Sequence, residues 1–544
     1  MKISVEQGIA QAKSSFKRGD FGAAKELYQN ILQTFPHNKR AKRGLAEVLR
    51  NQRKLPHSSI KTELDRLGQM YNQGNFSAVV NTANSINKRS PKEVSVWEIL
   101  GAAHRGLGNI KEASAAFKTV VELNPYYAEG YNNLGVALQD QGKYEESIEC
   151  FTKALSIKSN YAEAHNNLGN VLEEMGRLEE AVSSYRNAIL FRSNFAEAHN
   201  NLGVTFEKLG QLDDAKASYK NAIELNPDYA EAYNNLGNVL EEMGRYEDAE
   251  AKYRQALALK HNFFEAHNNL GNILRFSKKY KEAIHHFDLL NNDFGTALSL
   301  ECLYINKNYV EFENRLNTLS LSENMNLRVA ALSSFAAHQM KKKDPYPFCK
   351  NPIDFVSIQN ISDYDFDTEN VIHKIIKETD KFNLKWEART TKFGFQGPSD
   401  IFENPSKIIL VLEKIIHKAI ETYYNNFRSE SNIFIKSWPK KYKLSGWYNK
   451  LVKNGHHTSH IHQTGWLSGV IYLKTINLPN SDEGAIEFGL HGYDLPIIDK
   501  NYPRKIHRPK RGDIVLFPSS LFHRTIPFTM DSERSTIAFD LKAV

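Results

Sequence analysis

The residues best suited to chemistry lie near the C-terminal end of the chain. His460 and His462 are separated by a single residue, and His523 follows much later. Successive side chains of a β-strand alternate between its two faces, so imidazoles at positions i and i+2 of a strand point to the same side. With a third imidazole from a neighbouring strand, they provide three nitrogen ligands, which predicts a site for one divalent metal ion.

A second pair of residues with the same spacing predicts a binding site for a carboxylate. Arg534 and Thr536 share one face of a strand. A guanidinium group binds a carboxylate in a two-pronged fork, and a hydroxyl two residues further on adds a third hydrogen bond. We therefore expect Arg534 to hold a carboxylate beside the metal. The alternative is a surface ion pair between Arg534 and either Glu533 or Asp531.

This set of motifs resembles the double-stranded β-helix of the Fe(II)/2-oxoglutarate-dependent dioxygenases, and specifically a bacterial and phage branch of these oxygenases. The resemblance runs from about Thr390 to the C-terminus. In addition to the three histidines and the arginine, it is carried by four short segments. These are Thr391–Gln396 (TKFGFQ), Trp447–Asn449 (WYN), Leu467–Leu473 (LSGVIYL) and Phe517–Pro518.

The resemblance implies Fe(II) as the metal and 2-oxoglutarate as cosubstrate. Decarboxylation of 2-oxoglutarate to succinate is then coupled to the hydroxylation of a C–H bond. By the same resemblance, His460 and His523 hold the iron with His462 at the position of the remaining ligand, and Arg534 and Thr536 bind the distal carboxylate of 2-oxoglutarate. Tyr472 matches a tyrosine that shares this task in the prolyl-hydroxylase-like enzymes, and Asn449 is expected to contact the cosubstrate as well.

His462 departs from the pattern of the resembling enzymes, most of which have Asp or Glu at this position. A neutral imidazole leaves the iron site one unit more positive. Three-histidine iron dioxygenases exist on a related barrel, so activity is compatible with this set. Alternatively, a carboxylate such as Glu487, or a water molecule, takes the place of His462. We expect His456 and His457 to be exposed or to face the substrate.

The C-terminal part of the chain reads as a β-protein preceded by one long helix. An amphipathic helix is predicted at about 406–427, and short runs rich in β-branched and aromatic residues follow it. Such strands, separated by glycine turns, are typical of a jelly-roll. The basic run Lys500–Arg511 is predicted to be a solvated loop between strands. The predicted strands are 444–452, 466–474, 485–488, 513–517 and 535–541.

The N-terminal half is an internal repeat of 34 residues, the strongest periodic signal in the chain. Leu-Gly pairs mark each copy, and the second helix of each copy carries a small residue followed four positions later by an aromatic one. A glycine lies where the first helix ends, because glycine tolerates the left-handed conformation found there. The pattern resembles the tetratricopeptide repeat (TPR). The Leu-Gly pairs begin at Leu100, Leu134, Leu168, Leu202, Leu236 and Leu270.

The repeats are predicted to form an all-α solenoid over residues 3–293, with about eight copies and the most regular part at 94–293. Residues 38–59 break the period, and we expect an extra helix there. Residues 294–385 are expected to contribute a helical cap and a proline-punctuated linker, and residues 386–544 the jelly-roll.

Paired asparagines precede each Leu-Gly and are expected to line the concave face of the solenoid. An amide side chain both donates and accepts hydrogen bonds, so a row of them can bind an extended peptide whatever its sequence. The row is similar to the asparagine ladder of O-linked N-acetylglucosamine transferase. The alternative is that the asparagines stabilise neighbouring helices or face water. The predicted peptide-binding residues are Asn133, Asn167, Asn201, Asn235 and Asn269.

Composition narrows the class of protein. With 41% hydrophobic and 24% charged residues, the chain has the composition of a soluble protein, and its 544 residues predict two or three domains. A net charge of +7 without a concentrated basic face argues against a nucleic-acid partner. No apolar run is long enough for a membrane span, and the three dispersed cysteines fit a reducing compartment, so we expect a cytoplasmic protein.

Three functions are compatible with these features. The first is a hydroxylase acting on a protein or peptide that the TPR concave face captures. The second is a hydroxylase of a small molecule or glycan, in which the repeats serve localisation or assembly. The third is a TPR interaction scaffold whose jelly-roll has lost catalysis. The retention of His460, His523, Arg534 and Tyr472 in one frame favours an oxygenase. The oligomeric state and the hydroxylated atom stay open.

Overall fold

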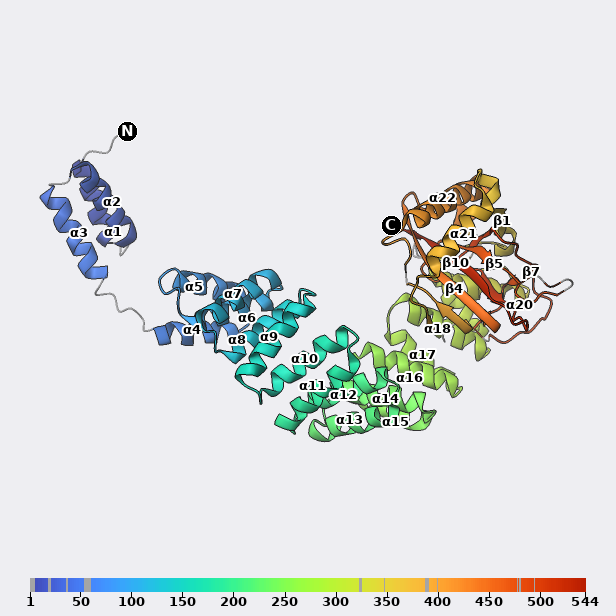
Figure 1. Ribbon diagram of the computed structural model, residues 1–544, viewed down its shortest axis with the longest axis horizontal. Helices are drawn as coiled ribbons and strands as arrows, with labels where there is room; N and C mark the ends of the chain where they lie inside the picture. Colours follow the sequence, from blue (N-terminus) through green and yellow to red (C-terminus); the bar gives the residue numbers. More distant parts are fainter. Residues whose placement is uncertain are drawn as a thin grey trace. The chain divides into compact units, whose positions relative to one another are not determined.

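The computed structural model describes residues 5–17, 21–35, 38–52, 60–321, 325–346, 348–386, 391–398, 400–476, 478, 481–493 and 495–544 (Figure 1). The chain divides into two compact units, residues 1–227 and 228–544. The division falls inside the repeat array, because helices at its C-terminal end pack onto the helices that cover the β-sheet. Residues 53–59, the end of the predicted extra helix, lie outside the described residues.

The first unit is all-α: among the described residues, its first three helices pack on one another, and the helices from residue 60 onward form a continuous stack of hairpins. The predicted extra helix is present as α3, in the interval where the 34-residue period is broken. The helices are α1 (Val5–Lys17), α2 (Phe21–Thr34), α3 (Lys39–Gln52), α4 (Ile60–Asn72), α5 (Phe76–Asn87), α6 (Val94–Gly106), α7 (Ile110–Leu123), α8 (Ala128–Gln139), α9 (Tyr144–Ile157), α10 (Ala162–Glu174), α11 (Leu178–Phe191), α12 (Ala196–Lys208) and α13 (Leu212–Leu225).

Two kinds of glycine explain the period. Gly142 follows α8 with φ +71°, a conformation that other residues rarely adopt, so the chain can reverse into the next helix. Gly169 lies within α10 for a different reason: a Cβ there would lie 2.6 Å from the ring of Tyr185 on α11. The two helices of a repeat therefore pack closely only when a glycine faces the aromatic side chain.

The second unit begins with the last regular repeats and continues into irregular helices. Residue Glu301 of α18 is buried and forms ion pairs with Arg328 and Arg275, while the apolar residues of the same helix join the core beneath the sheet. The helices are α14 (Ala230–Glu242), α15 (Tyr246–Leu259), α16 (Phe264–Phe276), α17 (Tyr280–Leu289), α18 (Asp293–Ile305), α19 (Tyr309–Leu319) and α20 (Leu327–Met340).

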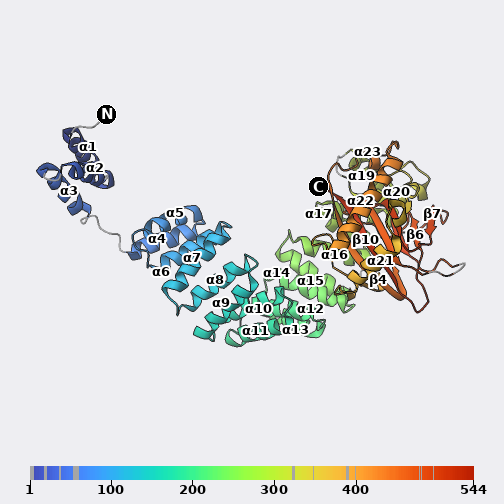
Figure 2. The same cartoon turned by 45° about the horizontal axis from the view of Figure 1, so that its top comes forward.

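Two antiparallel sheets form the C-terminal jelly-roll. A seven-stranded sheet has the order β1-β8-β5-β10-β4-β3-β2, and a three-stranded sheet has the order β7-β6-β9. Figure 2 labels β4 and β10 of the large sheet and β6 and β7 of the small one. The strands are β1 (Ser357–Asn360), β2 (Lys385–Trp386), β3 (Thr391–Gln396), β4 (Tyr442–His457), β5 (Leu467–Lys474), β6 (Ile486–Gly489), β7 (Arg504–His507), β8 (Asp513–Pro518), β9 (Phe522–Thr525) and β10 (Arg534–Ala543).

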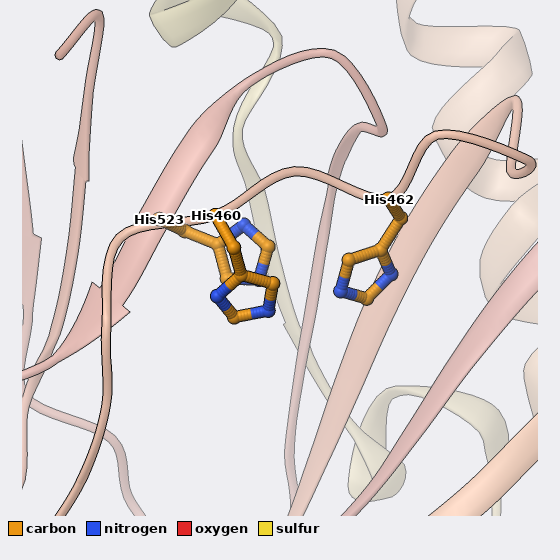
Figure 3. Close-up of side chains that lie close together, drawn as sticks. All are labelled: His460, His462 and His523. Atoms are coloured by element: carbon orange, nitrogen blue, oxygen red, sulfur yellow. The ribbon is translucent and has the colours of Figure 1, made fainter. Parts of the chain in front are cut away.

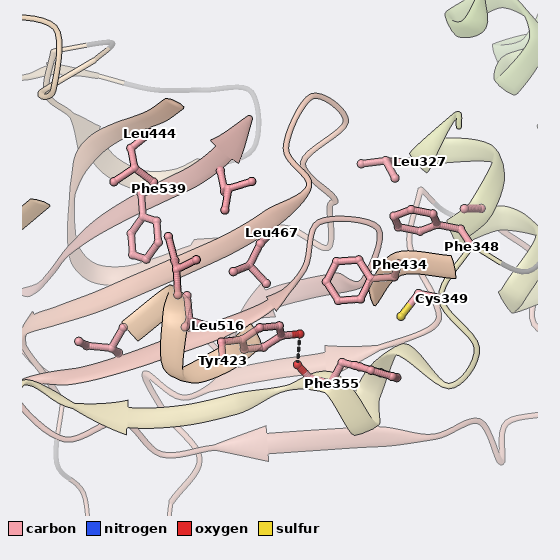
Figure 4. Packing of buried hydrophobic residues seen from close by; sticks show 14 of the residues in the cluster. Leu327, Phe348, Cys349, Phe355, Tyr423, Phe434, Leu444, Leu467, Leu516 and Phe539 are labelled. Atoms are coloured by element: carbon pink, nitrogen blue, oxygen red, sulfur yellow. Dashed lines mark hydrogen bonds between the residues drawn. The ribbon is translucent and has the colours of Figure 1, made fainter. Parts of the chain in front are cut away.

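The large sheet is covered on both faces. Helices α21 (Thr368–Thr379), α22 (Lys407–Phe427) and α23 (Ile433–Lys436) join α18 and α20 in one apolar core on its outer face (Figure 4). In this core the hydroxyl of Tyr423 donates to the carbonyl of Phe355 at 2.8 Å. A smaller core that includes Val470, Phe488 and Phe517 fills the space between the two sheets. Because both faces are buried, β5 and β8 are almost continuously apolar rather than alternating.

The fold confirms the predicted class, an all-α TPR solenoid followed by a jelly-roll, and corrects one element. The long predicted helix is α22, and the five predicted runs 444–452, 466–474, 485–488, 513–517 and 535–541 correspond to β4, β5, β6, β8 and β10. The basic run Lys500–Arg511 is not simply a loop, because Arg504–His507 pairs with β6 as β7. In the described part of the chain, no helix combines the length and the apolar character that a membrane span requires.

Candidate metal centre

Three imidazoles from separate segments converge in the jelly-roll. His523 lies on β9, while His460 and His462 lie just beyond the end of β4 (Figure 3). One ring nitrogen of each lies within 4.8 Å of one from the others. The ring centroids are 4.4 Å apart for His460 and His523, 5.0 Å for His462 and His523, and 5.4 Å for His460 and His462. This spacing suits three ligands of one ion.

The backbone that carries this pair differs from the expected strand. His460 forms an isolated antiparallel bridge with His523, in which each backbone N–H donates to the other carbonyl at 3.1 Å. His462 donates its N–H to the carbonyl of Ser519 at 3.0 Å. The prediction that both histidines lie within a strand is therefore wrong. The two rings nevertheless face the same side, because these backbone bonds hold the segment extended beside β9.

Hydrogen bonds fix the tautomer of all three rings. Nδ1 of His460 lies 2.7 Å from the carbonyl oxygen of Thr458, and Nδ1 of His523 lies 3.2 Å from that of Leu521. Nδ1 of His462 lies 2.6 Å from Oδ1 of Asp540. Carbonyl and carboxylate oxygens only accept, so each Nδ1 carries the proton and each Nε2 keeps a lone pair. This is the tautomer that a metal-binding histidine needs.

Burial keeps His460 and His523 neutral. It lowers the pKa of His460 to about 4, with a further contribution from nearby His462. Burial and the neighbouring imidazoles also hold the pKa of His523 well below its ordinary value. Only a neutral imidazole can donate a lone pair to a metal, so the site is prepared for ligation at neutral pH.

The histidines open onto a cavity of about 190 Å³. Gln396, Asn449 and Thr536 line it in one row across three strands, because Gln396 pairs with Asn449 and Asn449 with Thr536. The row continues to Tyr472, which pairs with Thr536 on the next strand but does not line the cavity itself. Residues paired across neighbouring strands share a face of the sheet. The lining residues are Thr391, Gln396, Trp447, Asn449, His457, His460, His462, Val470, Ile486, His523, Thr525, Arg534, Thr536 and Ala538.

Arg534 is buried in this cavity without a counter-charge. Arg534 is 2% exposed, and among the described residues no carboxylate lies within ion-pair distance of its guanidinium. Its guanidinium lies 4.9 Å from the ring centre of Tyr472. The Nε of Arg534 and the hydroxyl of Tyr472 are buried without a hydrogen-bond partner among the residues that the structure describes. Burial lowers the pKa of Arg534 and raises that of Tyr472.

Two alternatives from the sequence are wrong. Arg534 is no surface ion pair, because Glu533 binds Lys450 and Lys474 instead. Glu487 does not complete the metal site, because its carboxylate accepts from the guanidinium of Arg524 at 2.7 Å. Neighbouring Ile486 lines the cavity, and side chains alternate along β6, so Glu487 points to the opposite face.

Several residues of the cavity were not assigned a role from the sequence. Gln396 and Trp447 belong to the motifs that carried the resemblance, but nothing in their spacing marked them as lining residues. His457 lies within the cavity, and its Nδ1 is 3.1 Å from the hydroxyl of Thr525, whereas Nδ1 of His456 faces the carbonyl of Asn454. Asp540 was missed entirely. The alternation of side chains along the strand could have found it, because Asp540 lies four residues after Thr536 and therefore on the same face.

The asparagines of the repeats form a second polar system. Asn167 donates to Asn132 at 3.0 Å, and Asn201 donates to Asn166 and Asn170 at 3.2 and 3.1 Å. These bonds join neighbouring repeats, as the stabilising alternative expects. In the second unit, Asn269 donates to Asn234 and Asn238 in the same way, and in the first, Asn133 donates to Glu98 at 3.4 Å.

Some of these asparagines also border a groove in the first unit. It has a volume of about 1030 Å³ and includes Asn132, Asn133, Asn166 and Asn167 in its lining. Charged residues of both signs, among them Arg105 and Glu163, stand along it. The groove is large and polar enough to receive an extended chain.

The structure therefore combines a jelly-roll that contains a candidate three-histidine metal centre with helical repeats. Comparison with known families agrees with this class. Residues 445–540 match the family model described as "Putative 2OG-Fe(II) oxygenase". Models of tetratricopeptide repeats match residues 9–57, 101–142, 137–176, 174–210, 194–260 and 238–290. The chain thus joins tetratricopeptide repeats to a segment that matches this oxygenase family.

Solved structures with similarity to this chain include MamA, YrrB and pilF of Pseudomonas aeruginosa. MamA is 26% identical over 30% of this chain and 95% of its own, with a TM-score of 0.28. YrrB, described as a TPR protein with an unusual peptide-binding site, is 20% identical over 34% and 95%, with a TM-score of 0.29. The pilF protein is 21% identical over 40% and 97%, with a TM-score of 0.33. No curated protein matches the chain.

Proposed function

We propose that this chain is a 2-oxoglutarate- and Fe(II)-dependent oxygenase that hydroxylates a protein or peptide held by its TPR repeats. One observation carries the proposal. Three imidazoles with Nε2 lone pairs and an unpaired, buried guanidinium share a single cavity of about 190 Å³. An isolated buried cation is costly, so its presence calls for an anionic ligand. A dicarboxylate can bind the metal with one end and the guanidinium of Arg534 with the other, so it suits both groups.

The donor set fits the iron. His460, His462 and His523 would hold the metal through Nε2, since each Nδ1 is already bonded. Imidazole nitrogen is a ligand that suits Fe(II), and three such ligands leave positions for cosubstrate and oxygen. Bound Fe(II) and 2-oxoglutarate supply the oxidising chemistry that converts a C–H bond to an alcohol.

The residues around the guanidinium fit the cosubstrate. Arg534 would bind its distal carboxylate in a fork, and the hydroxyls of Thr536 and Tyr472 stand on the same face of the sheet to add hydrogen bonds. The amide of Asn449, opposite Thr536, orients the ligand further. Apolar side chains of Val470, Ile486 and Ala538 exclude water from the reacting end of the cavity.

The repeats provide the second part of the proposal. The groove of the first unit offers amide groups at the 34-residue period of the array, which suits the regular donors and acceptors of an extended peptide backbone. We expect Asn133, Asn167 and Asn201 to bind this backbone in addition to joining the repeats, together with Asn235 and Asn269 in the next repeats.

Metal and cosubstrate binding test the enzyme directly. Under anaerobic conditions, the wild-type chain with Fe(II) should develop a visible charge-transfer band on addition of 2-oxoglutarate. The variant His523→Ala removes one ligand and should lose the band, whereas His373→Ala, an exposed histidine on α21, should keep it. A wild-type chain that binds Fe(II) without a band, or binds no Fe(II), would support the scaffold alternative.

The arginine has its own test. Arg534→Met should weaken 2-oxoglutarate binding by at least ~2 kcal/mol, about thirtyfold, while leaving Fe(II) binding intact. Unchanged 2-oxoglutarate affinity would contradict the assigned carboxylate grip.

The class of substrate is tested by measuring two reactions separately, peptide hydroxylation and the uncoupled decarboxylation of 2-oxoglutarate. Asn133→Ala with Asn167→Ala should reduce peptide hydroxylation but leave uncoupled decarboxylation of 2-oxoglutarate unchanged, because the latter depends only on the jelly-roll. Equal rates of peptide hydroxylation in variant and wild type would favour a small-molecule substrate.

A further inference from the structure

The three imidazoles are held by unequal partners. Nδ1 of His460 and of His523 each faces a neutral backbone carbonyl. Nδ1 of His462 faces the carboxylate of Asp540 at 2.6 Å. His462 is also the ligand that stands where the resembling enzymes carry Asp or Glu. Of the three partners, the charged one, Asp540, therefore bonds to His462, the ligand that differs from the resembling enzymes.

Asp540 is built into the interior of the jelly-roll. It is 4% exposed on β10, opposite Ser468 of β5, whose hydroxyl donates to the same Oδ1 at 2.7 Å. Ser519 in turn lies 2.8 Å from the hydroxyl of Ser468. Within the described part of the chain, no lysine or arginine lies within ion-pair distance of this carboxylate, and His462 is its one ionisable partner.

The chain also leaves room for this contact. Gly465 lies three residues beyond His462, and a Cβ there would be 2.9 Å from Cγ of Asp540 and 2.7 Å from the hydroxyl oxygen of Ser519. Any larger residue at this position must displace the carboxylate or the serine. The glycine is therefore explained by the close approach of Asp540 to the loop that carries His462.

We infer that Asp540 is a positioning residue that supplies, through His462, the negative charge that a carboxylate ligand supplies directly in the resembling enzymes. The inference rests on the proposed function. A carboxylate bound to Nδ1 aims Nε2 of the imidazole at the metal and increases its strength as a donor. Burying a carboxylate without a cation costs free energy. This cost is offset when the imidazole that the carboxylate bonds is ligated to a divalent ion.

Metal affinity tests this role without requiring turnover. Co(II) alone is titrated into the full-length, metal-free chain and followed by calorimetry and by its visible d–d bands. Asp540→Asn keeps an oxygen in place but removes the charge, and we expect Co(II) affinity to fall about 10- to 100-fold with a shift of the bands. Asp540→Ala should lose at least as much.

Two control variants separate charge from packing. Asp513→Asn changes another buried carboxylate of the same domain, which binds His507 at 3.0 Å away from the cavity, and should leave Co(II) affinity unchanged. Ser468→Ala removes the second bond to Oδ1 but keeps the charge, and should cause only a small part of the loss. Should Asp540→Asn not fold, Gly465→Ala displaces the same carboxylate and is expected to weaken Co(II) binding.

The outcomes are distinguishable. A wild-type chain that binds neither Co(II) nor Fe(II) overturns the proposed function and this inference with it. If wild type binds and Asp540→Asn binds equally well while Asp540→Ala does not, the charge has no role and the inference is overturned. If all Asp540 variants, or a folded Gly465→Ala variant used in their place, bind Co(II) as tightly as wild type, the inference is overturned as well.

Discussion

The asparagine row of the repeats and the cavity of the jelly-roll both bury polar side chains, but they treat them in opposite ways. In the repeats, Asn201 donates to Asn166 and Asn170, so the polar groups of neighbouring helices satisfy each other. In the jelly-roll, Nε of Arg534 and the hydroxyl of Tyr472 are buried without partners in the described part of the chain. Buried polar groups are nearly always paired in folded proteins. A paired group is explained by the fold, whereas a buried charge that faces a cavity without a counter-charge calls for a ligand.

The same contrast exists between two arginines of the second unit. Arg328 is 8% exposed and binds both carboxylate oxygens of Glu301, at 2.6 and 3.0 Å. Arg534 is 2% exposed and has no carboxylate partner in the described chain. One guanidinium therefore stabilises the fold, while the other is held in place at a cost that ligand binding would offset.

The largest expected effect comes from substituting these two arginines with methionine. Arg328→Met leaves Glu301 buried with only Arg275 as partner, and should lower the free energy of unfolding by about 3 kcal/mol. Arg534→Met removes an unpaired charge, and should leave stability unchanged or raise it by up to ~2 kcal/mol in the ligand-free chain. Urea denaturation followed by circular dichroism measures both. A similar loss of stability for both variants would remove the distinction between the two arginines.

Acid should lower the stability of the metal-free chain, because burial holds His460 neutral. Burial lowers the pKa of His460 from 6.5 to about 4. As the pH falls below 6.5 the unfolded chain takes up this proton first, so unfolding is favoured until the folded chain is protonated near pH 4. The metal-free chain should therefore lose up to ~3 kcal/mol of stability between these values on account of His460.

The variant His460→Gln isolates this contribution, because it lacks the titrating group. Its stability should fall less steeply than that of wild type between pH 6.5 and pH 4. Parallel stability curves for the two proteins would show that His460 is not the group held neutral.

The smallest effect is expected in the asparagine row. Asn201→Ala removes two bonds between repeats and should lower the stability of the first unit by ~1 kcal/mol. Asn187→Ala, at an exposed position on α11, is the matched control and should change stability by less than about 0.5 kcal/mol. Equal stability of the two variants would mean that the asparagines do not hold neighbouring repeats together, and would leave peptide binding as their main role.

The repeats were predictable because each one is specified locally. The Leu-Gly step and the glycine that follows the first helix fix where each helix begins and ends, and every repeat contacts mainly its neighbours. The same period did not show whether Asn167 binds a neighbouring repeat or a peptide. That depends on the distance to Asn132 in the preceding repeat, which only the packed helices define.

The strands of the jelly-roll were predictable in part. Long apolar runs such as β5 and β8 were recognisable, but β7 and β9 are short and polar on one side, so their sequences resemble loops. Placing the cavity required the pairing between strands. Gln396, Asn449, Thr536 and Tyr472 come from four strands, and their alignment follows from register alone.

The sequence by itself determined the fold class, the 34-residue period and the residue types that can bind a metal and a carboxylate, because these are local properties of composition and spacing. The tertiary structure decided which of these residues share a cavity, that Glu487 is turned away and that Asp540 stands behind His462. The reason is that hydrogen bonding of ring nitrogens and the absence of a partner for a buried guanidinium are set by contacts between segments far apart in the chain.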